Sequence, residues 1–228
     1  MNLERTGPKF DVIQYLDARQ KSLLVVDEIL AKLQEGMSEK DGKNLINECF
    51  LKIDSKKKWH PSKFRIAKNT LKSFKEESDE SIRLKKGDAV FIDVGPVIGE
   101  HEADLGRSII FQPESSSKEH LEFINSSKEL FFFLEKKWQL EDLSGEKLYL
   151  EAETWCQERA LLFNPKMAGH RLGDFPHALI TRESLANFKE KPKDMLWVLE
   201  IHILHPELQI GSFYEDILIK NDSSELLS

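Results

Sequence analysis

Apolar side chains recur with the period of a helix over the first part of the chain. The pattern runs through residues 11–35 and ends near Gly36, which predicts one long helix. A second helix is predicted over 38–53, because Ser38 supplies an N-terminal capping signal ahead of the next run. Residues 59–74 are expected to form a loop and a short strand.

The middle and the end of the chain alternate between strand-like and helix-like patterns. Two strands are predicted within 89–111, where Gly95, Pro96 and Gly99 supply the turn chemistry between them. The order of helices, a strand pair, helices and strands predicts an α+β or mixed α/β fold rather than a parallel doubly wound sheet. The remaining predicted segments are a polar connector at 113–120, helices over 118–139 and 145–162, a Gly-, Pro- and His-rich loop or short strand at 164–177, strands over 195–204 and 213–220, and a frayed end at 221–228.

Composition is that of an ordinary soluble, globular protein. The 228 residues are 40% hydrophobic and 32% charged, and the net charge of −7 gives no reason to expect a nucleic acid or an acidic membrane as partner. No run of about 18 apolar residues and no secretory signal are visible, so a cytoplasmic location is expected. The two cysteines, Cys49 and Cys156, follow no disulfide or metal-binding pattern and are expected in the core.

Carboxylates interrupt four of the apolar runs. Asp93 and Asp104 lie in the first strand pair, and Glu200 and Glu215 each lie inside a later strand. Burying a lone ionised carboxylate is costly, and these strands offer mainly Arg107 as a partner. Divalent cations would neutralise the four acids together, and two ions would do so better than one. The alternative is four unrelated acids on exposed strand faces.

A histidine is available to complete such a site. His170, in the sequence AGHRLG, offers an imidazole. A set of four carboxylates and one histidine suits Mn²⁺, Fe²⁺, Co²⁺ or Zn²⁺ better than a thiolate site would.

The same five residues occur in the order of a known family's metal ligands. The motifs are IDVG at Asp93, DLGR at Asp104, GHRLG at His170, LEIH at Glu200 and YEDILI at Glu215. In these motifs the chain resembles the pita-bread metallopeptidases, which include methionine aminopeptidases, Xaa-Pro aminopeptidases, prolidases and creatinase. The resemblance covers roughly residues 10–220.

The resemblance implies an α+β, pita-bread fold, with an antiparallel sheet flanked by helices and a central metal site. It implies that residues 1–228 form one catalytic domain without a separate N-terminal domain. It also implies two divalent ions about 3.5–4 Å apart that share a hydroxide, which attacks the scissile carbonyl. Asp93 and Glu215 are the expected bridging ligands, with Asp104 assisting Asp93 at one ion and His170 and Glu200 completing the other.

The resemblance implies further roles around the metals. Glu200 is the expected proton shuttle to the leaving amine. His177, seven positions after His170, is expected to contact the substrate and to stabilise the developing oxyanion together with the metal.

The sequence departs from the family's pattern at several positions. Proline-directed members usually carry a histidine where Lys166 stands, often an arginine where Phe213 stands, and commonly a histidine after the counterpart of Asn69. Gly106 replaces a threonine, and Ile201 replaces a proline. These departures weaken an expectation of Xaa-Pro specificity but not of metal binding.

Other residues have weaker claims to the site. His60 is a candidate to line the substrate pocket, against a loop histidine that stacks on Trp59. His202 shares a strand face with Glu200 and is a candidate to support it. Arg107 is expected to pair either with a ligand carboxylate or in a structural salt bridge. Packing roles are expected for His101 and His205.

These features favour a dinuclear metal-dependent hydrolase, most simply an aminopeptidase that removes N-terminal residues from peptides. Two alternatives stay open: a same-fold enzyme that acts on a non-peptide substrate, and a non-catalytic binding module, which the intact ligand set argues against. The expected partner is a peptide or small amide, without nucleic acid or membrane. A homodimer is left open, and the Phe-rich run at 130–138 is expected to be helix core or an oligomer face.

Overall fold

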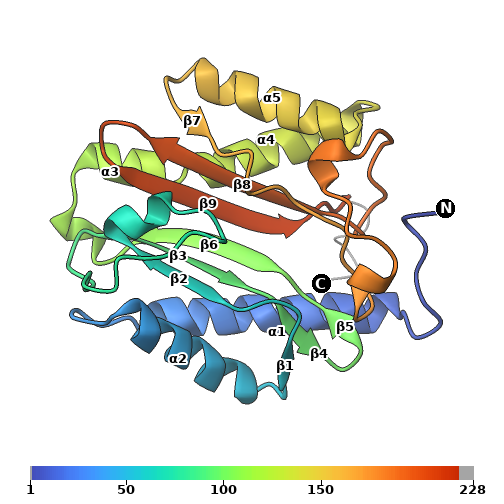
Figure 1. The fold of residues 1–228 in the computed structure, drawn as a ribbon, viewed down its shortest axis with the longest axis horizontal. Coiled ribbons are helices and arrows are strands. Elements are labelled where there is room, and N and C mark those ends of the chain that lie inside the picture. The colour runs from blue at the N-terminus through green and yellow to red at the C-terminus, as the bar shows by residue number, and fades with distance from the viewer. Residues whose placement is uncertain (1, 221–228) are drawn as a thin grey trace.

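A six-stranded antiparallel sheet runs through the centre of the molecule, in the strand order β2-β3-β6-β9-β8-β7 (Figure 1). The computed structural model describes residues 2–220. In sheet order the strands are β2 (Lys63–Ile66), β3 (Ala89–Val94), β6 (Leu105–Ile110), β9 (Ile210–Ile217), β8 (Val198–His205) and β7 (Leu162–Phe163). A smaller sheet, in the order β1-β4-β5, contains β1 (Lys57–Lys58), β4 (Pro96–Ile98) and β5 (His101–Glu102).

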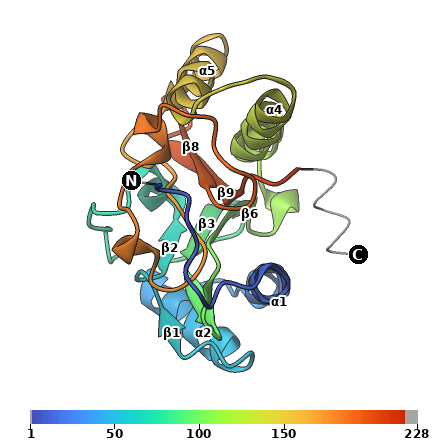
Figure 2. The ribbon, with the colours of Figure 1, turned by 90° about the vertical axis from the view of Figure 1, so that its right-hand side faces the viewer.

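Helices cover one face of the long sheet in two groups (Figure 2). One group lies along β2, β3 and β6, and the other lies along β9 and β8. Each group forms its own buried core with the sheet. The first group is α1 (Val12–Ala31) and α2 (Glu39–Leu51), the second is α4 (Ser126–Leu140) and α5 (Gly145–Gln157), and α3 (Lys118–Ile124) precedes α4. Short 3-10 turns lie at Ala67–Leu71, Pro113–Ser115, His177–Leu179 and Leu185–Asn187.

Alternation along the strands leaves the opposite face of the sheet free for chemistry. In β3, Val90 and Ile92 belong to the core under α1 and α2, so Asp93 points to the other side. In β8, Ile201 belongs to the core under α4 and α5, so Glu200 also points away from the helices.

The two N-terminal helices confirm the prediction, although each ends earlier than expected. α1 begins after Asp11, whose carboxylate caps its first turn, and α2 begins after Ser38, which forms a capping box with Asp41. The helices end at Ala31 and Leu51.

The middle of the chain is more divided than predicted. Residues 89–111 form four strands instead of two, because Gly99, with a φ of 61°, turns the chain back within the segment. The single helix predicted over 118–139 is two helices that meet at Asn125. The side-chain amide of Asn125 donates to the carbonyl of Leu121, a local bond that competes with continuing the helix.

Other boundaries also differ. The helix predicted over 145–162 ends at Gln157, because Ala160 takes a left-handed conformation with a φ of 54°. The two residues of β7 then pair with β8 instead. The strand predicted over 213–220 starts at Ile210 and ends at Ile217. The predicted connector opens with a 3-10 turn and runs into α3, residues 164–177 are mostly irregular, and the end predicted to fray, 221–228, lies outside the described residues.

Candidate metal centre

Three carboxylates stand in one row across the sheet. Asp93 of β3 lies opposite Gly106 of β6, and Gly106 lies opposite Glu215 of β9. Glu215 lies in turn opposite Glu200 of β8. Paired residues of antiparallel strands share a face, so the three acids project to the same side, away from the helices. Gly106 leaves room for them, because a Cβ there would lie 2.2 Å from the Phe213 ring and 2.7 Å from Glu215 Cβ.

Asp104 and His170 join the row from neighbouring segments. Asp104 precedes Gly106 by two residues, which puts its carboxylate on the same face. The carbonyl of His170 accepts a hydrogen bond from the backbone N–H of Val198 at the start of β8. Gly169 permits this close approach, because a Cβ there would lie 1.9 Å from the Val198 carbonyl oxygen. As a result His170 Nε2 lies 2.9 Å from Asp104 Oδ2.

Two histidines present the same ring nitrogen to the acids. Nδ1 of His170 lies 2.8 Å from the carbonyl oxygen of Arg171, which can only accept, so Nδ1 carries a proton. Nδ1 of His60 lies 3.0 Å from the carbonyl oxygen of Pro61, with the same consequence. Nε2 of His60 lies 3.2 Å from Asp104 Oδ1 and 3.4 Å from Asp93 Oδ1. In both rings Nε2 is therefore the nitrogen placed to bind a metal.

These side chains form two groups of potential ligands. One group is His60, Asp93 and Asp104, the other is Asp104, His170 and Glu215, and within each group the ligand atoms lie within 4.8 Å of one another. Asp104 belongs to both groups. In the described part of the chain, no lysine or arginine lies at ion-pair distance from these acids, and the ion-pair partners of Asp93 and Asp104 are histidines. Carboxylate oxygens and imidazole nitrogens are ligands that suit a divalent metal, and such an ion would supply the positive charge that these acids lack.

The clustered carboxyls shift one another's pKa values. Burial raises the pKa of Asp93 to about 6. Burial and then the charge of Asp93 raise the pKa of Glu200 well above its usual range, and burial and then Asp104 do the same for Glu215. Burial would also raise the pKa of Asp104, but hydrogen bonds with the two histidines bring it below its usual value. Burial lowers and the two aspartates raise the pKa of His60, which reaches about 9.

A cavity of about 190 Å³ opens onto this cluster. Asp93, Asp104 and Glu215 are 3%, 2% and 3% exposed, so the alternative of unrelated acids on exposed strand faces is wrong for these three. Its apolar lining residues, Trp59, Phe74, Met167 and Ala168, suit a small side chain. The cavity is lined by Asp93, Asp104, Glu200, Glu215, His60 and His170, and by Trp59, Phe74, Lys166, Met167 and Ala168.

Glu102, which sequence reasoning missed, holds His177. Its carboxylate is fully buried and lies 2.7 Å from His177 Nδ1, and it accepts the backbone N–H of His177 at 3.1 Å. The His177 ring stacks on His170 with centroids 5.1 Å apart and meets Trp59 edge-on. His177 is not among the residues that line the cavity, and its contact with substrate stays a prediction. Glu102 could have been identified as a candidate from its position two residues before Asp104, because residues two apart in an extended segment share a side.

His202 lies outside the cavity and forms hydrogen bonds to two other segments. Its Nδ1 accepts from the Asn164 side-chain amide at 2.9 Å, and its Nε2 donates to the Thr70 carbonyl at 2.8 Å. Burial lowers the pKa of His202 to about 4, which keeps this ring neutral. Among the other candidates, His101 accepts a hydrogen bond from the backbone N–H of Asp11, and His205 packs against Phe123. Arg107 pairs with Asp216 rather than with one of the clustered acids. Cys49 and Cys156 lie in the core.

The chain belongs to metallopeptidase family M24, whose profile matches residues 14–221. No curated protein matches the chain. No helix within residues 2–220 is long and apolar enough to cross a membrane.

Solved structures confirm the predicted pita-bread fold. The prolidase from Pyrococcus horikoshii is 18% identical with a TM-score of 0.73, and the match covers 94% of this chain and 60% of that one. The X-Pro aminopeptidase from Thermotoga maritima is 16% identical with a TM-score of 0.72, and 92% and 58% are covered. The methionine aminopeptidase from Thermotoga maritima is 14% identical with a TM-score of 0.69, and 94% of each chain is covered. The chain thus spans about three fifths of the length of the prolidase.

Proposed function

We propose that the chain is an aminopeptidase that uses two divalent metal ions to release N-terminal residues from short peptides. The observation that carries this proposal is the row of buried Asp93, buried Glu215 and half-buried Glu200, joined by Asp104 and His170, with no lysine or arginine at ion-pair distance in residues 2–220. Membership of a metallopeptidase family supports the reaction class. The names of the similar structures, two of which are aminopeptidases, support the choice of substrate.

Five side chains would hold the ions: Asp93, Asp104, His170, Glu200 and Glu215. Asp104 belongs to both candidate groups, so its carboxylate would help to hold both ions, a role that the sequence analysis gave to Asp93 and Glu215. Asp93 would serve one ion, with His60 beside it, and Glu215, His170 and Glu200 would serve the other. When bound, the ions supply Lewis acidity and a nucleophilic water at neutral pH.

The chain's own residues would position the substrate and move the proton. The carboxylate of Glu200 faces the cavity and would accept a proton from the attacking water and deliver it to the leaving amine. Trp59 and Phe74 would pack against the N-terminal side chain and keep bulk water away. Glu102 would fix the ring of His177 at the edge of this site, where it orients the substrate.

The test is a comparison of free and blocked peptides. Protein loaded with Mn²⁺, Co²⁺ or Zn²⁺ should release the first residue of tri-alanine but leave N-acetyl-tri-alanine intact. Asp104→Ala should lose both the activity and the metal, whereas Asp27→Ala, which removes an exposed carboxylate of α1, should lose neither. Failure to cleave any free peptide with both ions bound would overturn the proposal in favour of a non-peptide substrate or a binding role.

A further inference from the structure

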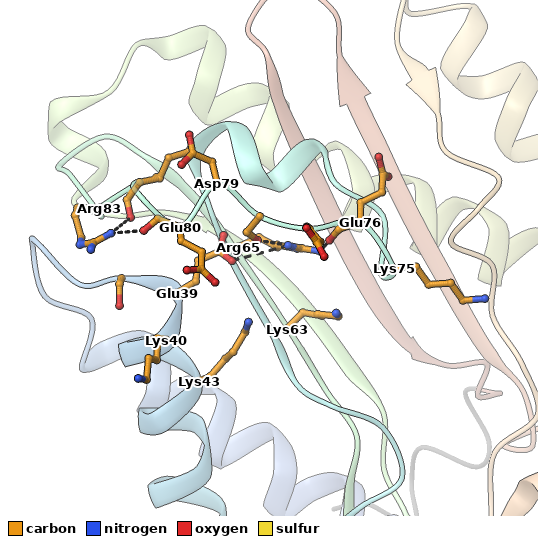
Figure 3. Close-up of a pocket in the computed structure, with 14 residues that line it drawn as sticks. Glu39, Lys40, Lys43, Lys63, Arg65, Lys75, Glu76, Asp79, Glu80 and Arg83 are labelled. Atoms are coloured by element: carbon orange, nitrogen blue, oxygen red, sulfur yellow. Dashed lines mark hydrogen bonds and ion pairs between the residues drawn. The ribbon is translucent and has the colours of Figure 1, made fainter.

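A second hollow, lined by charged residues, lies beside the metal cavity. It has a volume of about 560 Å³ and is bounded by α2, β2 and the loop of residues 75–83 (Figure 3). We call it the lysine groove, after Lys40, Lys43, Lys63 and Lys75, which line it. The lysine groove and the metal cavity meet at Phe74. This ring lines the metal cavity, and the ammonium of Lys63 lies 4.2 Å from its centroid.

Lys63 extends the row of metal-site residues by one strand. It lies directly opposite Asp93 in the pairing of β2 with β3, so both side chains leave the same face of the sheet. Neighbouring strands are about 4.8 Å apart, so the start of the Lys63 side chain is one strand away from a ligand carboxylate. A substrate held at the metal site would therefore bring its next groups within reach of this lysine.

Lys63 is a half-buried residue without a carboxylate at ion-pair distance in the described part of the chain. Within residues 2–220, Lys63 forms no ion pair, and its ammonium lies over the Phe74 ring. Burial, followed by the charges of Arg65 and Lys43, lowers the pKa of Lys63, and the charges of Asp93 and Glu39 offset this shift only in part. A carboxylate supplied by a ligand would give the ammonium of Lys63 a charge-assisted hydrogen bond.

Two further lysines flank the same point. Lys75 follows Phe74 in the chain, and Figure 3 shows Lys63 and Lys75 extending their ammonium groups toward the same side of the lysine groove. Lys166 lines the metal cavity together with Phe74. Neither Lys75 nor Lys166 forms an ion pair in the described part of the chain.

The acids of the lysine groove are largely committed to other partners. Glu39 accepts hydrogen bonds from the Ile66 backbone and from Ser78, which also bonds to Arg65. Glu76 accepts the backbone N–H of Ser73 at 2.8 Å. Asp79 accepts from Ser81, and Glu77 and Glu80 are exposed. Lys63 is the groove's cation that contacts Phe74, and so it lies on the side of the metal cavity.

We propose that Lys63, flanked by Lys75 and Lys166, binds a carboxylate of the substrate, so that the enzyme prefers short peptides with a negative charge within about one residue of the scissile bond. This inference rests on the proposed function. The carboxylate has two sources, the free C-terminus of a dipeptide or the side chain of an acidic residue, and both present the same group to Lys63.

Four peptides separate these sources. Ala-Ala carries a C-terminal carboxylate, Ala-Glu-amide and Glu-Ala-amide carry a side-chain carboxylate on either side of the scissile bond, and Ala-Ala-amide carries none. The wild type should have a lower KM for at least one charged peptide than for Ala-Ala-amide. In Lys63→Met, that KM should rise about 10-fold with little change in kcat, because one charge-assisted bond is lost. Lys63→Arg should keep most of the preference. Lys68→Met, which removes an exposed lysine lining neither hollow, should behave as wild type.

Calorimetric binding of the same peptides to the metal-loaded protein distinguishes a failure of the proposed function from a failure of the carboxylate site. If no peptide is cleaved, the proposed function fails, but tighter binding of a charged peptide that is lost in Lys63→Met still supports the carboxylate site. If Lys63→Met does not fold, Lys75→Met and Lys166→Met, which change exposed residues, should each weaken the preference about threefold. Equal KM and equal binding for charged and neutral peptides in the wild type would overturn the inference.

Discussion

Glu215 and Asp216 are neighbours on β9, 3% and 2% exposed, and they point to opposite faces of the sheet. Asp216 faces the helices, where Arg19 of α1 and Arg107 of β6 both reach its carboxylate at 2.7 Å. Burial would raise the pKa of Asp216, but the two guanidinium groups bring it below its usual value. Glu215 faces the cavity, where burial and then Asp104 raise its pKa.

The difference distinguishes a structural acid from a candidate metal ligand. The chain neutralises Asp216 with its own cations, so that carboxylate belongs to the packing of α1 against the sheet. On the other face of the same strand, the described residues leave Glu215 without a lysine or arginine at ion-pair distance. An acid that a fold buries without a counter-charge is placed to take one from outside.

The largest effect is expected from Glu215→Gln. Losing one proposed metal ligand should lower turnover of a free peptide about 10³-fold or more, because the metal's Lewis acidity is worth several kcal/mol. Without metal, this variant should be as stable as wild type or more so, because a carboxyl with a raised pKa has been removed. Turnover, together with urea unfolding in EDTA, checks both halves. A metal-free variant that is much less stable would assign Glu215 a structural role.

Asp216→Asn should show the reverse pattern. The substitution leaves Arg19 and Arg107 partly buried without their counter-charge, so the free energy of unfolding should fall by about 3 kcal/mol. Metal content per folded molecule should stay unchanged. Urea unfolding and elemental analysis of the two variants side by side make the test, and loss of metal in the well-folded Asp216→Asn protein would contradict the assignment.

The stability of the metal-free protein should fall as pH rises. Burial raises the pKa of Asp93 in the folded protein to about 6, so its contribution to stability is full below about pH 4 and is lost as pH rises through about 6. His60, with a pKa of about 9, acts in the same direction, from about pH 6.5 to about pH 9. The two groups together should lose on the order of 3 kcal/mol between pH 4.5 and 7.5. Unfolding in EDTA and in Mn²⁺ gives the comparison, and the same pH slope in both would argue against a metal on these acids.

The smallest effect is expected from Glu102→Gln. The amide can still meet the backbone N–H of His177 but gives a weaker bond to Nδ1, so kcat should fall about 10-fold with metal content unchanged. Glu100→Gln, at an exposed carboxylate two residues earlier, is the matched control. An unchanged kcat in Glu102→Gln would reassign the contact with His177 to packing.

The sequence was most informative where an acid broke an apolar run. Asp93 and Glu215 could be predicted as buried candidate ligands, because their apolar neighbours in the chain favour burial and a lone buried carboxylate is costly. The predicted helices of the first part also formed, since capping and periodicity act locally. What local pattern does not encode is pairing between distant segments. The register that sets Lys63 beside Asp93, and the contact of Glu102 with His177, 75 positions away, depend on the assembled sheet and loops.

The most direct measurement is metal stoichiometry on the purified chain, by elemental analysis after adding Mn²⁺, Co²⁺ or Zn²⁺ and removing the excess. The row of acids, which has no lysine or arginine at ion-pair distance within residues 2–220, predicts about two equivalents per chain in wild type, with loss of metal in Asp93→Ala and none in Asp27→Ala. No bound metal under any of these conditions, or full occupancy in Asp93→Ala, would contradict the account of these acids as a dinuclear site.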